Sequence, residues 1–399
     1  MPLPRVAVLC AITGLGGAEI SLLELVARLH DLYEFHLIVP GEGLFKRNAE
    51  LAGAKVWVLP WPEVIARTGE TAVCPRPMQL FRAALCLRSF TRRLSELIDE
   101  IGPSVFLTNT LKAHILGALT RKPKHIPLIW YMRDGLEDRS LSRKLLALLS
   151  RRCDLALCIS RYVASQFRKY VSESVPANVV YNIIDFSRFR PGALPPADLH
   201  KRPEEVWYGM VGAITPLKGH DVFLDAAERV LSQLPKAMFL IVGNNPYVTE
   251  EGLLYEQQLR RRVANSTLRD RVKFVGFRND IPGVLSQLDV LVQPNRGPEG
   301  LGRSLLEAMA CGVPVVAVNK WGPAELIQDG QTGLLFRPLD AEQLAAHMLK
   351  LGGNHSLRKN MGQRGHDWIQ QNLVSKKLAG EFDRILASAI SSHLQEAAA

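Results

Sequence analysis

The sequence predicts an α/β protein with two mainly parallel sheets. Apolar runs of strand length alternate with helical patterns along most of the chain, as in sheets covered by helices. At 399 residues the chain exceeds one ordinary hydrophobic core and suggests two domains. Its 47% apolar residues and mean hydropathy of +0.03 are typical of a globular protein, and no apolar run is long enough to span a bilayer.

In the first half, a buried strand at residues 6–9 precedes a glycine loop at 14–17 and a helix at about 18–30. Strand, glycine loop and helix form a geometry that binds phosphate, and a plain tight turn is the alternative. Further strands between helical patterns are predicted at residues 34–39, 55–59, 104–108, 127–132 and 154–159.

The segment 75–101 is predicted to be a helix with a basic start and an apolar stripe that packs on the sheet. Phe81 and Leu85 fall outside that stripe, among basic residues. Apolar side chains among arginines suit a contact of segment 76–93 with an anionic membrane, and a solvated helix face is the alternative. The arginines concerned are Arg76, Arg82, Arg88, Arg92 and Arg93.

The second half begins with a strand at residues 206–211, and Lys218 follows just before a helix from Asp221. A lysine there can act as a point charge for phosphates, and an exposed lysine is the alternative. Strands are also predicted at residues 239–242 and 272–275.

Residues 288–318 read as strand, loop, helix and strand, with Glu299 in the loop and Glu307 in the helix. Gly300 and Gly302 lie between them, where the helix begins. Glycines allow close approach of a ligand, and a helix N-terminus favours an anionic group such as a diphosphate. Glu307 could accept hydrogen bonds from both ribose hydroxyls, and Glu299 from a hydroxyl-rich group beyond the phosphates. A solvated helix face is the alternative.

The string EGLGRSLLEAMACGVPVV from Glu299 to Val316 closely resembles the E-x7-E signature of the family 4 retaining glycosyltransferases. The resemblance implies the GT-B fold, with two Rossmann-like domains facing across a cleft. It also implies that Glu299 contacts the transferred sugar and Glu307 the nucleotide ribose. The backbone N–H groups between them then hold the diphosphate, at Gly300, Leu301, Gly302 and Arg303.

Four domain assignments follow from the resemblance. Residues 1–190 form an N-terminal Rossmann-like domain that binds the acceptor, and residues 204–374 form a C-terminal one that binds the nucleotide sugar. Residues 191–203, rich in Pro and Ala, are the expected linker. The last helix, about 375–395, is expected to cross back and pack on the first domain.

Three further segments resemble the family. Gly16 and Gly17 match its first loop, which faces the cleft and the donor. Residues 212–219 match its G-R-x-x-x-x-K-G pattern at both ends, but Ala213 replaces the arginine, so Arg303 is our candidate for the second cation at the diphosphate. Arg278, next to Phe277, lies in the loop that in the family faces the nucleobase.

Many family members have a histidine where this chain has Arg133 and Asp134, at the end of a predicted strand. We expect Asp134 to orient or deprotonate an acceptor hydroxyl, with a surface ion pair or helix cap as the alternative.

The predicted function is transfer of a sugar, with retention, from a nucleotide-diphosphate sugar to an acceptor hydroxyl in glycan, polysaccharide or glycolipid biosynthesis. The catalytic residues are then Lys218, Glu299 and Asp134, in a hexosyltransferase-type enzyme. No D-x-D motif occurs, so we expect no metal or other cofactor. The alternatives are a glycoside hydrolase with paired carboxylates and a sugar-nucleotide-binding protein that has lost turnover.

A net charge of +10 and a pI near 9.4 indicate anionic partners. Sugar nucleotides and anionic lipid surfaces fit, whereas nucleic acid is not expected because no aromatic–basic module occurs. Six scattered cysteines without a C-x-x-C pair suit a reducing compartment. The apolar run at residues 5–10 is not followed by a signal-peptide cleavage site, so we expect a cytoplasmic protein. We also expect a glycan or lipid-linked acceptor and a peripheral contact with the inner face of the membrane.

Overall fold

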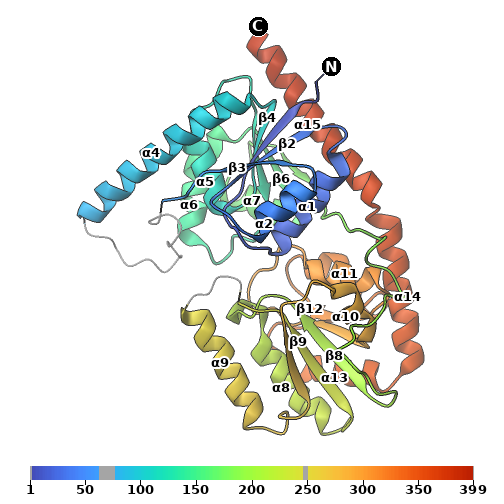
Figure 1. The fold of residues 1–399 in the computed structure, drawn as a ribbon. Coiled ribbons are helices and arrows are strands. Elements are labelled where there is room, and N and C mark those ends of the chain that lie inside the picture. Colours follow the sequence, from blue (N-terminus) through green and yellow to red (C-terminus); the bar gives the residue numbers. More distant parts are fainter. Residues whose placement is uncertain (1, 63–76, 246–249, 399) are drawn as a thin grey trace. The chain divides into compact units, whose positions relative to one another are not determined.

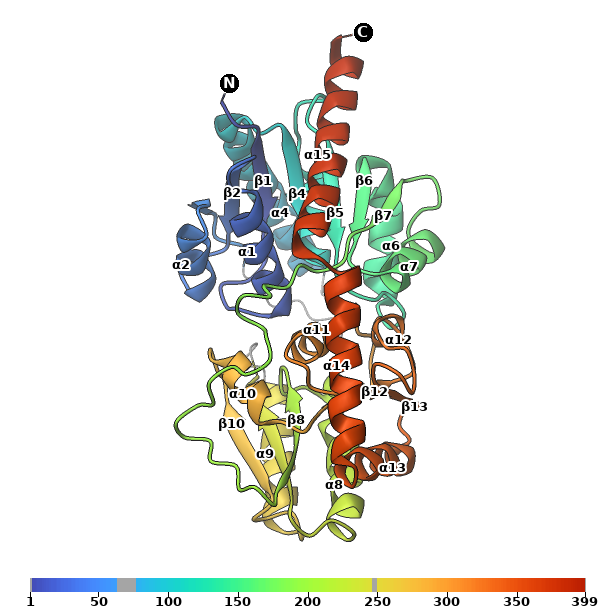
Figure 2. The same ribbon diagram turned by 90° about the vertical axis from the view of Figure 1, so that its right-hand side faces the viewer.

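The chain forms two compact units in a computed structural model that describes residues 2–62, 77–245 and 250–398. Unit 1 comprises Met1–Ile183 with Lys376–Ala399, and unit 2 comprises Ile184–Ser375. Each unit contains one parallel sheet with helices packed on it (Figures 1 and 2). The prediction of an α/β protein with two parallel sheets is therefore confirmed.

Seven parallel strands form the sheet of unit 1, in the order β3-β2-β1-β4-β5-β6-β7. Most of their residues are buried apolar side chains, which is typical of strands covered on both faces. The strands are β1 Arg5–Leu9, β2 Glu34–Val39, β3 Lys55–Val58, β4 Val105–Thr108, β5 Leu128–Met132, β6 Leu155–Cys158 and β7 Ala177–Val179.

The helices of unit 1 lie on both faces of this sheet. The strand order runs outward from β1 to β3 and then from β4 to β7, so right-handed crossovers place α1 and α2 on one face and α4 to α7 on the other. The helices are α1 Gly17–Leu29, α2 Leu44–Leu51, α4 Pro77–Ile101, α5 Leu111–Leu119, α6 Ser140–Leu149 with the 3-10 turn η1 Ser150–Arg152, and α7 Arg161–Tyr170.

The last helix, α15 Ser375–Ala398, completes unit 1. On β5, Trp130 packs against Phe167 of α7, and the next residue, Tyr131, points to the opposite face. There its ring lies 5.6 Å from that of Phe382 on α15. Tyr33 also donates a hydrogen bond of 2.7 Å to Asp383. The predicted return of the last helix to the N-terminal region is confirmed (Figure 2).

Unit 2 has six parallel strands in the order β10-β9-β8-β11-β12-β13. The strands are β8 Val206–Val211, β9 Ala237–Val242, β10 Val272–Gly276, β11 Val290–Gln293, β12 Val315–Val318 and β13 Leu334–Phe336. The helices are η2 Pro216–Lys218 (a 3-10 turn), α8 His220–Leu231, α9 Glu250–Ala264, α10 Ile281–Gln287, α11 Arg303–Ala310, α12 Pro323–Leu326, α13 Ala341–Gly352 and α14 His355–Asn372. Residues 191–203 belong to unit 2 and form turns and coil.

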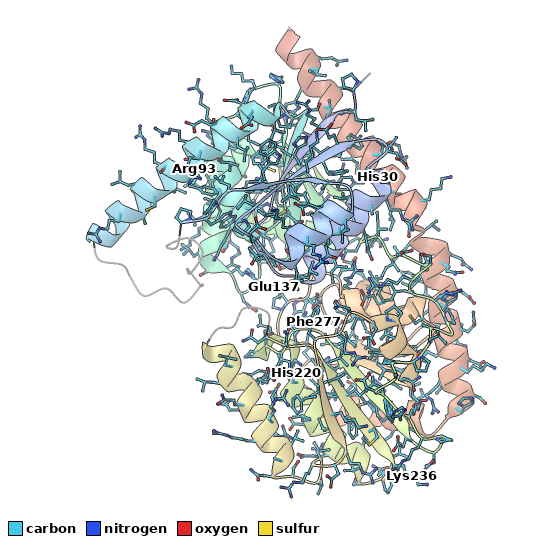
Figure 3. All side chains as sticks on the ribbon, viewed as in Figure 1. His30, Arg93, Glu137, His220, Lys236 and Phe277 are labelled. Atoms are coloured by element: carbon cyan, nitrogen blue, oxygen red, sulfur yellow. The ribbon has the colours of Figure 1, made fainter. Side chains whose placement is uncertain are left out.

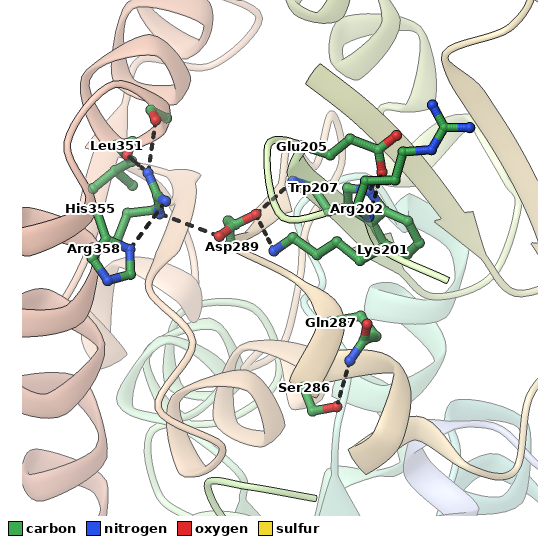
Figure 4. Close-up of polar contacts among 11 residues, drawn as sticks. Lys201, Arg202, Glu205, Trp207, Ser286, Gln287, Asp289, Leu351, His355 and Arg358 are labelled. Carbon is green, nitrogen blue, oxygen red and sulfur yellow. Dashed lines mark hydrogen bonds and ion pairs between the residues drawn. The ribbon is translucent and has the colours of Figure 1, made fainter. Parts of the chain in front are cut away.

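Asp289 fixes the amino edge of this sheet (Figure 4). Its carboxylate accepts a hydrogen bond of 2.7 Å from the backbone N–H of Trp207 and another from Lys201. Arg358 of α14 pairs with the other oxygen at 3.4 Å and donates to the carbonyl of Leu351. These contacts tie β8, β11 and α14 together at the edge opposite to the strand ends that carry the candidate site.

Among the helices in the described part of the chain, none combines the length and the apolar composition that crossing a bilayer requires.

Candidate functional site

Two loops meet at the carboxyl edge of the unit 2 sheet, because β8 and β11 are neighbours in it. The carbonyl of Leu217, in the loop after β8, accepts hydrogen bonds from Arg296 N and Gly297 N in the loop after β11, at 2.9 and 3.2 Å. Gly219 has φ +76°, and a Cβ there would lie 1.9 Å from the carbonyl oxygen of Pro294. Only glycine allows the two loops to approach this closely.

This approach brings together Lys218 and Glu299, which lie 81 residues apart in the sequence. The Lys218 ammonium group forms an ion pair with Oε2 of Glu299, and Asn295 donates to the same oxygen at 3.1 Å. Both charged side chains are partly exposed, so they remain within reach of a ligand. The sequence predicts a role for each of them but not their contact, and it gives no indication of Asn295.

Helix α11 begins at Arg303, directly after Gly302. Gly302 has φ +96°, and a Cβ there would lie 2.8 Å from Oε1 of Gln293 and 3.0 Å from Cδ1 of Leu305. The loop before it is held by a hydrogen bond of 3.1 Å from Gly322 N to the Glu299 carbonyl. The first turn of a helix presents N–H groups without partners inside the helix, which suits an anion.

Glu307 lies in the second turn of α11 and is nearly buried. Nε of Arg303, one turn earlier, lies 2.7 Å from Oε1 of Glu307, and each side chain is 9% exposed. The i, i+4 spacing indicates such a pair, whereas we had expected Arg303 at the diphosphate. The structure places Arg303 where it orients Glu307.

Arg278 lies on the loop after β10 and is held by two carboxylates. It donates to Asp280 at 2.7 Å and to Asp198 at 2.6 Å. Within the described chain, no hydrogen bond or ion pair connects Arg278 to the Lys218–Glu299 pair. The neighbouring Phe277 is 44% exposed (Figure 3), so the exposed ring on this loop is that of the phenylalanine.

His220 follows Gly219 directly and is buried at the start of α8 (Figure 3). Burial lowers its pKa to about 4, so the ring is neutral at physiological pH. Its ring meets the edge of Tyr255 at 6.1 Å, and Asp221, the next residue, pairs with Arg296. This packing supports the backbone of Lys218. A histidine beside a glycine gave no functional signal in the sequence.

In unit 1, Gly16 and Asp134 both follow strands at the carboxyl edge of the sheet. The buried Glu19 accepts a hydrogen bond of 3.2 Å from Gly16 N at the start of α1. Burial raises the pKa of Glu19. The charge of Arg133 lowers this pKa and the charge of Asp134 raises it, so the three side chains influence one another electrostatically. Gly17 is the first residue of α1.

Arg133 makes no ion pair with Asp134 in the described structure. Its guanidinium group donates to Asn109 at 2.6 Å and to Asn182 at 3.2 Å, and lies 4.0 Å from the centre of the Tyr131 ring. Asn109 and Asn182 were not predicted as site residues. The available signal was their position directly after β4 and shortly after β7.

The segment 76–93 is only partly described. Arg76, like Cys74, lies outside the described residues, and so do the side chains of 77–81, including Phe81. Leu85 is 53% exposed. Four of the arginines are exposed, namely Arg82, Arg88, Arg92 and Arg93, the last labelled in Figure 3.

Phe90, Leu94 and Ile98 form the buried stripe of α4 that packs on unit 1.

Of the described residues, no group of three or more His, Cys, Asp or Glu is arranged to hold a metal ion.

Two family models match the chain. Residues 15–188 match the model described as Glycosyltransferase Family 4, and residues 196–368 match the model described as Glycosyl transferases group 1. Together they cover the carboxyl edges of both sheets, including Gly16, Asp134, Lys218, Glu299 and Glu307.

Curated relatives resemble part of the chain. The lipopolysaccharide core biosynthesis mannosyltransferase LpsB of Rhizobium meliloti is 34% identical over 205 residues, which are 49% of this chain and 54% of LpsB. The GDP-mannose-dependent alpha-(1-6)-phosphatidylinositol monomannoside mannosyltransferase of Mycobacterium tuberculosis is 28% identical over 240 residues, 57% of this chain and 60% of that protein. The chain therefore spans between half and two thirds of the length of these relatives.

A solved structure resembles nearly the whole chain. Anabaena HepE in complex with UDP and glucose matches 96% of this chain and 100% of its own, with a TM-score of 0.78 and 21% sequence identity. This likeness shows that the fold is GT-B. With both halves of the chain matched by the corresponding family models, the protein belongs to the family 4 (group 1) glycosyltransferases.

Proposed function

We propose that the protein transfers a sugar, with retention of configuration, from a nucleotide-diphosphate sugar to an acceptor hydroxyl. The observation that carries this proposal is the meeting of Lys218 and Glu299 beside the start of α11, whose next turn holds Glu307. A cation, a helix N-terminus and two carboxylates are thus gathered at one edge of unit 2.

In the proposed donor site, the diphosphate binds at the start of α11, against the backbone from Gly300 to Arg303. Lys218 leaves its ion pair with Glu299 and neutralises the diphosphate, whose charge grows as the bond to the sugar breaks. Such preorganised electrostatic stabilisation is usually the largest single contribution to enzyme catalysis. Glu299, released from Lys218, accepts hydrogen bonds from the sugar hydroxyls.

Glu307 accepts the ribose hydroxyls in this proposal, with Arg303 fixing its side chain at 2.7 Å. We had expected Arg303 to supply a second positive charge at the diphosphate. The partial positive charge of the helix N-terminus then fills part of that role. Arg278 and Phe277 are proposed to face the base, and the exposed Phe277 ring is the better candidate for stacking. The assignment of Gly16 and Gly17 to the donor rests on the family resemblance alone.

We assign acceptor binding to the carboxyl edge of unit 1, where Asp134 orients the acceptor hydroxyl or takes up its proton as the new bond to the sugar forms. Of the relatives named above, one is a mannosyltransferase of lipopolysaccharide core biosynthesis and the other is a phosphatidylinositol monomannoside mannosyltransferase. We propose a lipid-linked glycan acceptor on this ground. The exposed arginines of 82–93 then assist by attracting an anionic membrane at the cytoplasmic side.

The test is a thermal-shift panel with UDP, GDP, ADP and CDP, each with and without Mg²⁺. Ligand at about a hundred times its Kd should raise the free energy of unfolding by about 2.7 kcal/mol. We expect a shift with one nucleotide, independent of Mg²⁺ because the proposed chemistry uses Lys218 in place of a metal. The shift should disappear in Lys218→Ala and in Glu307→Ala.

Lys236→Ala is the matched control, because this exposed lysine belongs to unit 2 but lies at its other end from His220 and Phe277 (Figure 3). It should keep the full shift. A chain that responds to no nucleotide would contradict the donor site. A nucleotide shift without sugar transfer to any lipid-linked acceptor would instead favour a binding protein that has lost turnover. We would then attribute the loss of turnover to Ala213, which replaces the arginine of the family pattern.

A further inference from the structure

Helix α6 carries a stripe of leucines that the described residues leave exposed. Leu141, Leu145 and Leu148 are 57%, 36% and 76% exposed. Their spacing of four and three residues places them on one side of the helix. Leu146 is the buried residue of α6. Exposed apolar side chains that form a continuous patch, in contrast to isolated ones, mark an interaction surface.

Cations lie beside these leucines and at the end of their helix. From Arg139 to Arg152 the sequence has five cations and no acid. Lys144, Arg151 and Arg152 are exposed. Lys144 lies three residues after Leu141, on the leucine side of α6, and Arg151 and Arg152 follow in the 3-10 turn η1 at the carboxyl end of the helix. We call this set the α6 surface: Leu141, Lys144, Leu145, Leu148, Arg151 and Arg152.

The neighbouring helices extend the same chemistry. α5 contacts both α4 and α6, so the three helices form one layer (Figure 1). At the end of α5, Leu119 is 39% exposed, and the exposed Arg121 follows it. Ser95 of α4 donates a hydrogen bond of 2.8 Å to the carbonyl of Arg121. The layer thus presents leucines and cations beyond α6.

We propose that the α6 surface binds an anionic phospholipid bilayer, with its leucines in the interfacial region and its cations at the lipid headgroups. Amphipathic helices with basic residues beside leucines bind membranes in this way, and each cation near the surface contributes to the attraction. A second copy of the chain is a poorer partner, because a symmetric contact of this patch would set cations against cations.

The position of α6 relates this contact to the proposed acceptor site. The loop from β5 to α6 contains Asp134, seven residues before Leu141 in the sequence. A bilayer on the α6 surface would therefore lie near the residue assigned to the acceptor hydroxyl, and only this point rests on the proposed function.

The test is flotation of the full chain with vesicles of phosphatidylcholine alone or of equal parts phosphatidylcholine and phosphatidylglycerol. We expect binding to the anionic vesicles only, weakened by salt. The triple variant Leu141→Ser, Leu145→Ser, Leu148→Ser should bind at least about tenfold more weakly. The variant Lys144→Gln, Arg151→Gln, Arg152→Gln should lose about fivefold in affinity for each cation removed.

The matched control is Leu32→Ser, Leu44→Ser, Leu51→Ser. These leucines are 49%, 55% and 79% exposed and lie at the end of α1 and on α2, on the other face of the unit 1 sheet. This control should bind like the unchanged chain. All variants should keep the nucleotide shift, which reports folding and separates this test from that of the donor site.

Three outcomes would overturn the proposal. They are equal binding to neutral and anionic vesicles, undiminished binding of both the leucine and the cation variants, or an equal loss in the control. If the leucine variant instead converts a dimer of the unchanged chain to a monomer without changing flotation, the α6 surface is a contact between copies.

Discussion

Lys218 and Glu299 show what a single residue contributes and why the sequence cannot reveal all of it. Their separate chemistry is evident from the flanking glycines and the helix pattern. Their ion pair is not evident from the sequence, because the two residues lie 81 positions apart. They meet only because Gly219 allows two loops to approach each other closely. The same reason explains why Asn295, whose hydrogen bond ends on Glu299, had no signal of its own.

A buried histidine in unit 1 should make the protein sensitive to acid. His114 is fully buried, its Nδ1 lies 2.6 Å from Oγ1 of Thr108, and its ring stacks on Trp130. Burial, with a smaller contribution from Arg133, lowers its pKa to about 3, against about 6.5 in an unfolded chain. Below about pH 6.5 the unfolded state takes up a proton that the folded state does not bind, so stability falls as the pH decreases towards about 3.

We therefore expect His114→Gln to reduce the loss of unfolding free energy between pH 7 and pH 5 by about 1–2 kcal/mol. Glutamine can keep a hydrogen bond to Thr108 but does not titrate. Urea titrations at the two pH values measure the difference. The exposed His125 provides the control, and His125→Gln should leave the pH dependence unchanged. An unchanged pH dependence in His114→Gln would contradict this assignment.

At the scale of elements, the start of α11 depends on the left-handed conformation of Gly302. Gly302→Ala should cost roughly 1–2 kcal/mol of stability through backbone strain. The new Cβ should also push against Gln293 and Leu305, at 2.8 and 3.0 Å, and displace the helix start. We expect the Kd for the nucleotide diphosphate, measured by calorimetry, to rise about tenfold or more because the N–H groups move.

Gly330→Ala separates strain from displacement. Gly330 also belongs to unit 2 and has φ +73°, but its Cβ would meet nothing within 4 Å. This variant should show a similar loss of stability with unchanged nucleotide affinity. Equal affinities in the two variants would mean that the start of α11 does not hold the diphosphate.

The elements themselves could largely be predicted from the sequence. Apolar runs at β1, β2, β5 and β11 and the E-x7-E string were sufficient, because buried parallel strands and glycine-marked helix starts leave local patterns. The pairing of Arg303 with Glu307 and of Arg278 with Asp198 was not predicted. In the first pair, Arg303 had two possible partners, Glu307 and the diphosphate, and the sequence does not decide between them. The second pair joins residues that lie 80 positions apart in the sequence.

At the scale of the whole molecule, unit 1 depends on a helix from the far end of the chain. Phe382 of α15 is fully buried against Tyr131, so Phe382→Ala should cost about 3–5 kcal/mol in unit 1. Hydrogen exchange should show faster exchange in β1, β4 and β5, while the strands of unit 2 keep their protection. The exposed Leu394 on the same helix is the control, and Leu394→Ala should change stability by less than about 0.5 kcal/mol. Equal loss of protection in both units would show that they unfold as one.

The discontinuity of unit 1 also sets an order of events at the ribosome. Unit 2 is one continuous segment, Ile184–Ser375, whereas Lys376–Ala399 emerges only after all of unit 2 has been made. Domains usually fold as they are synthesised, from the N-terminus onward. Here the first unit to be translated is the last to be completed, and until α15 arrives the face of its sheet beneath Tyr131 remains without its cover.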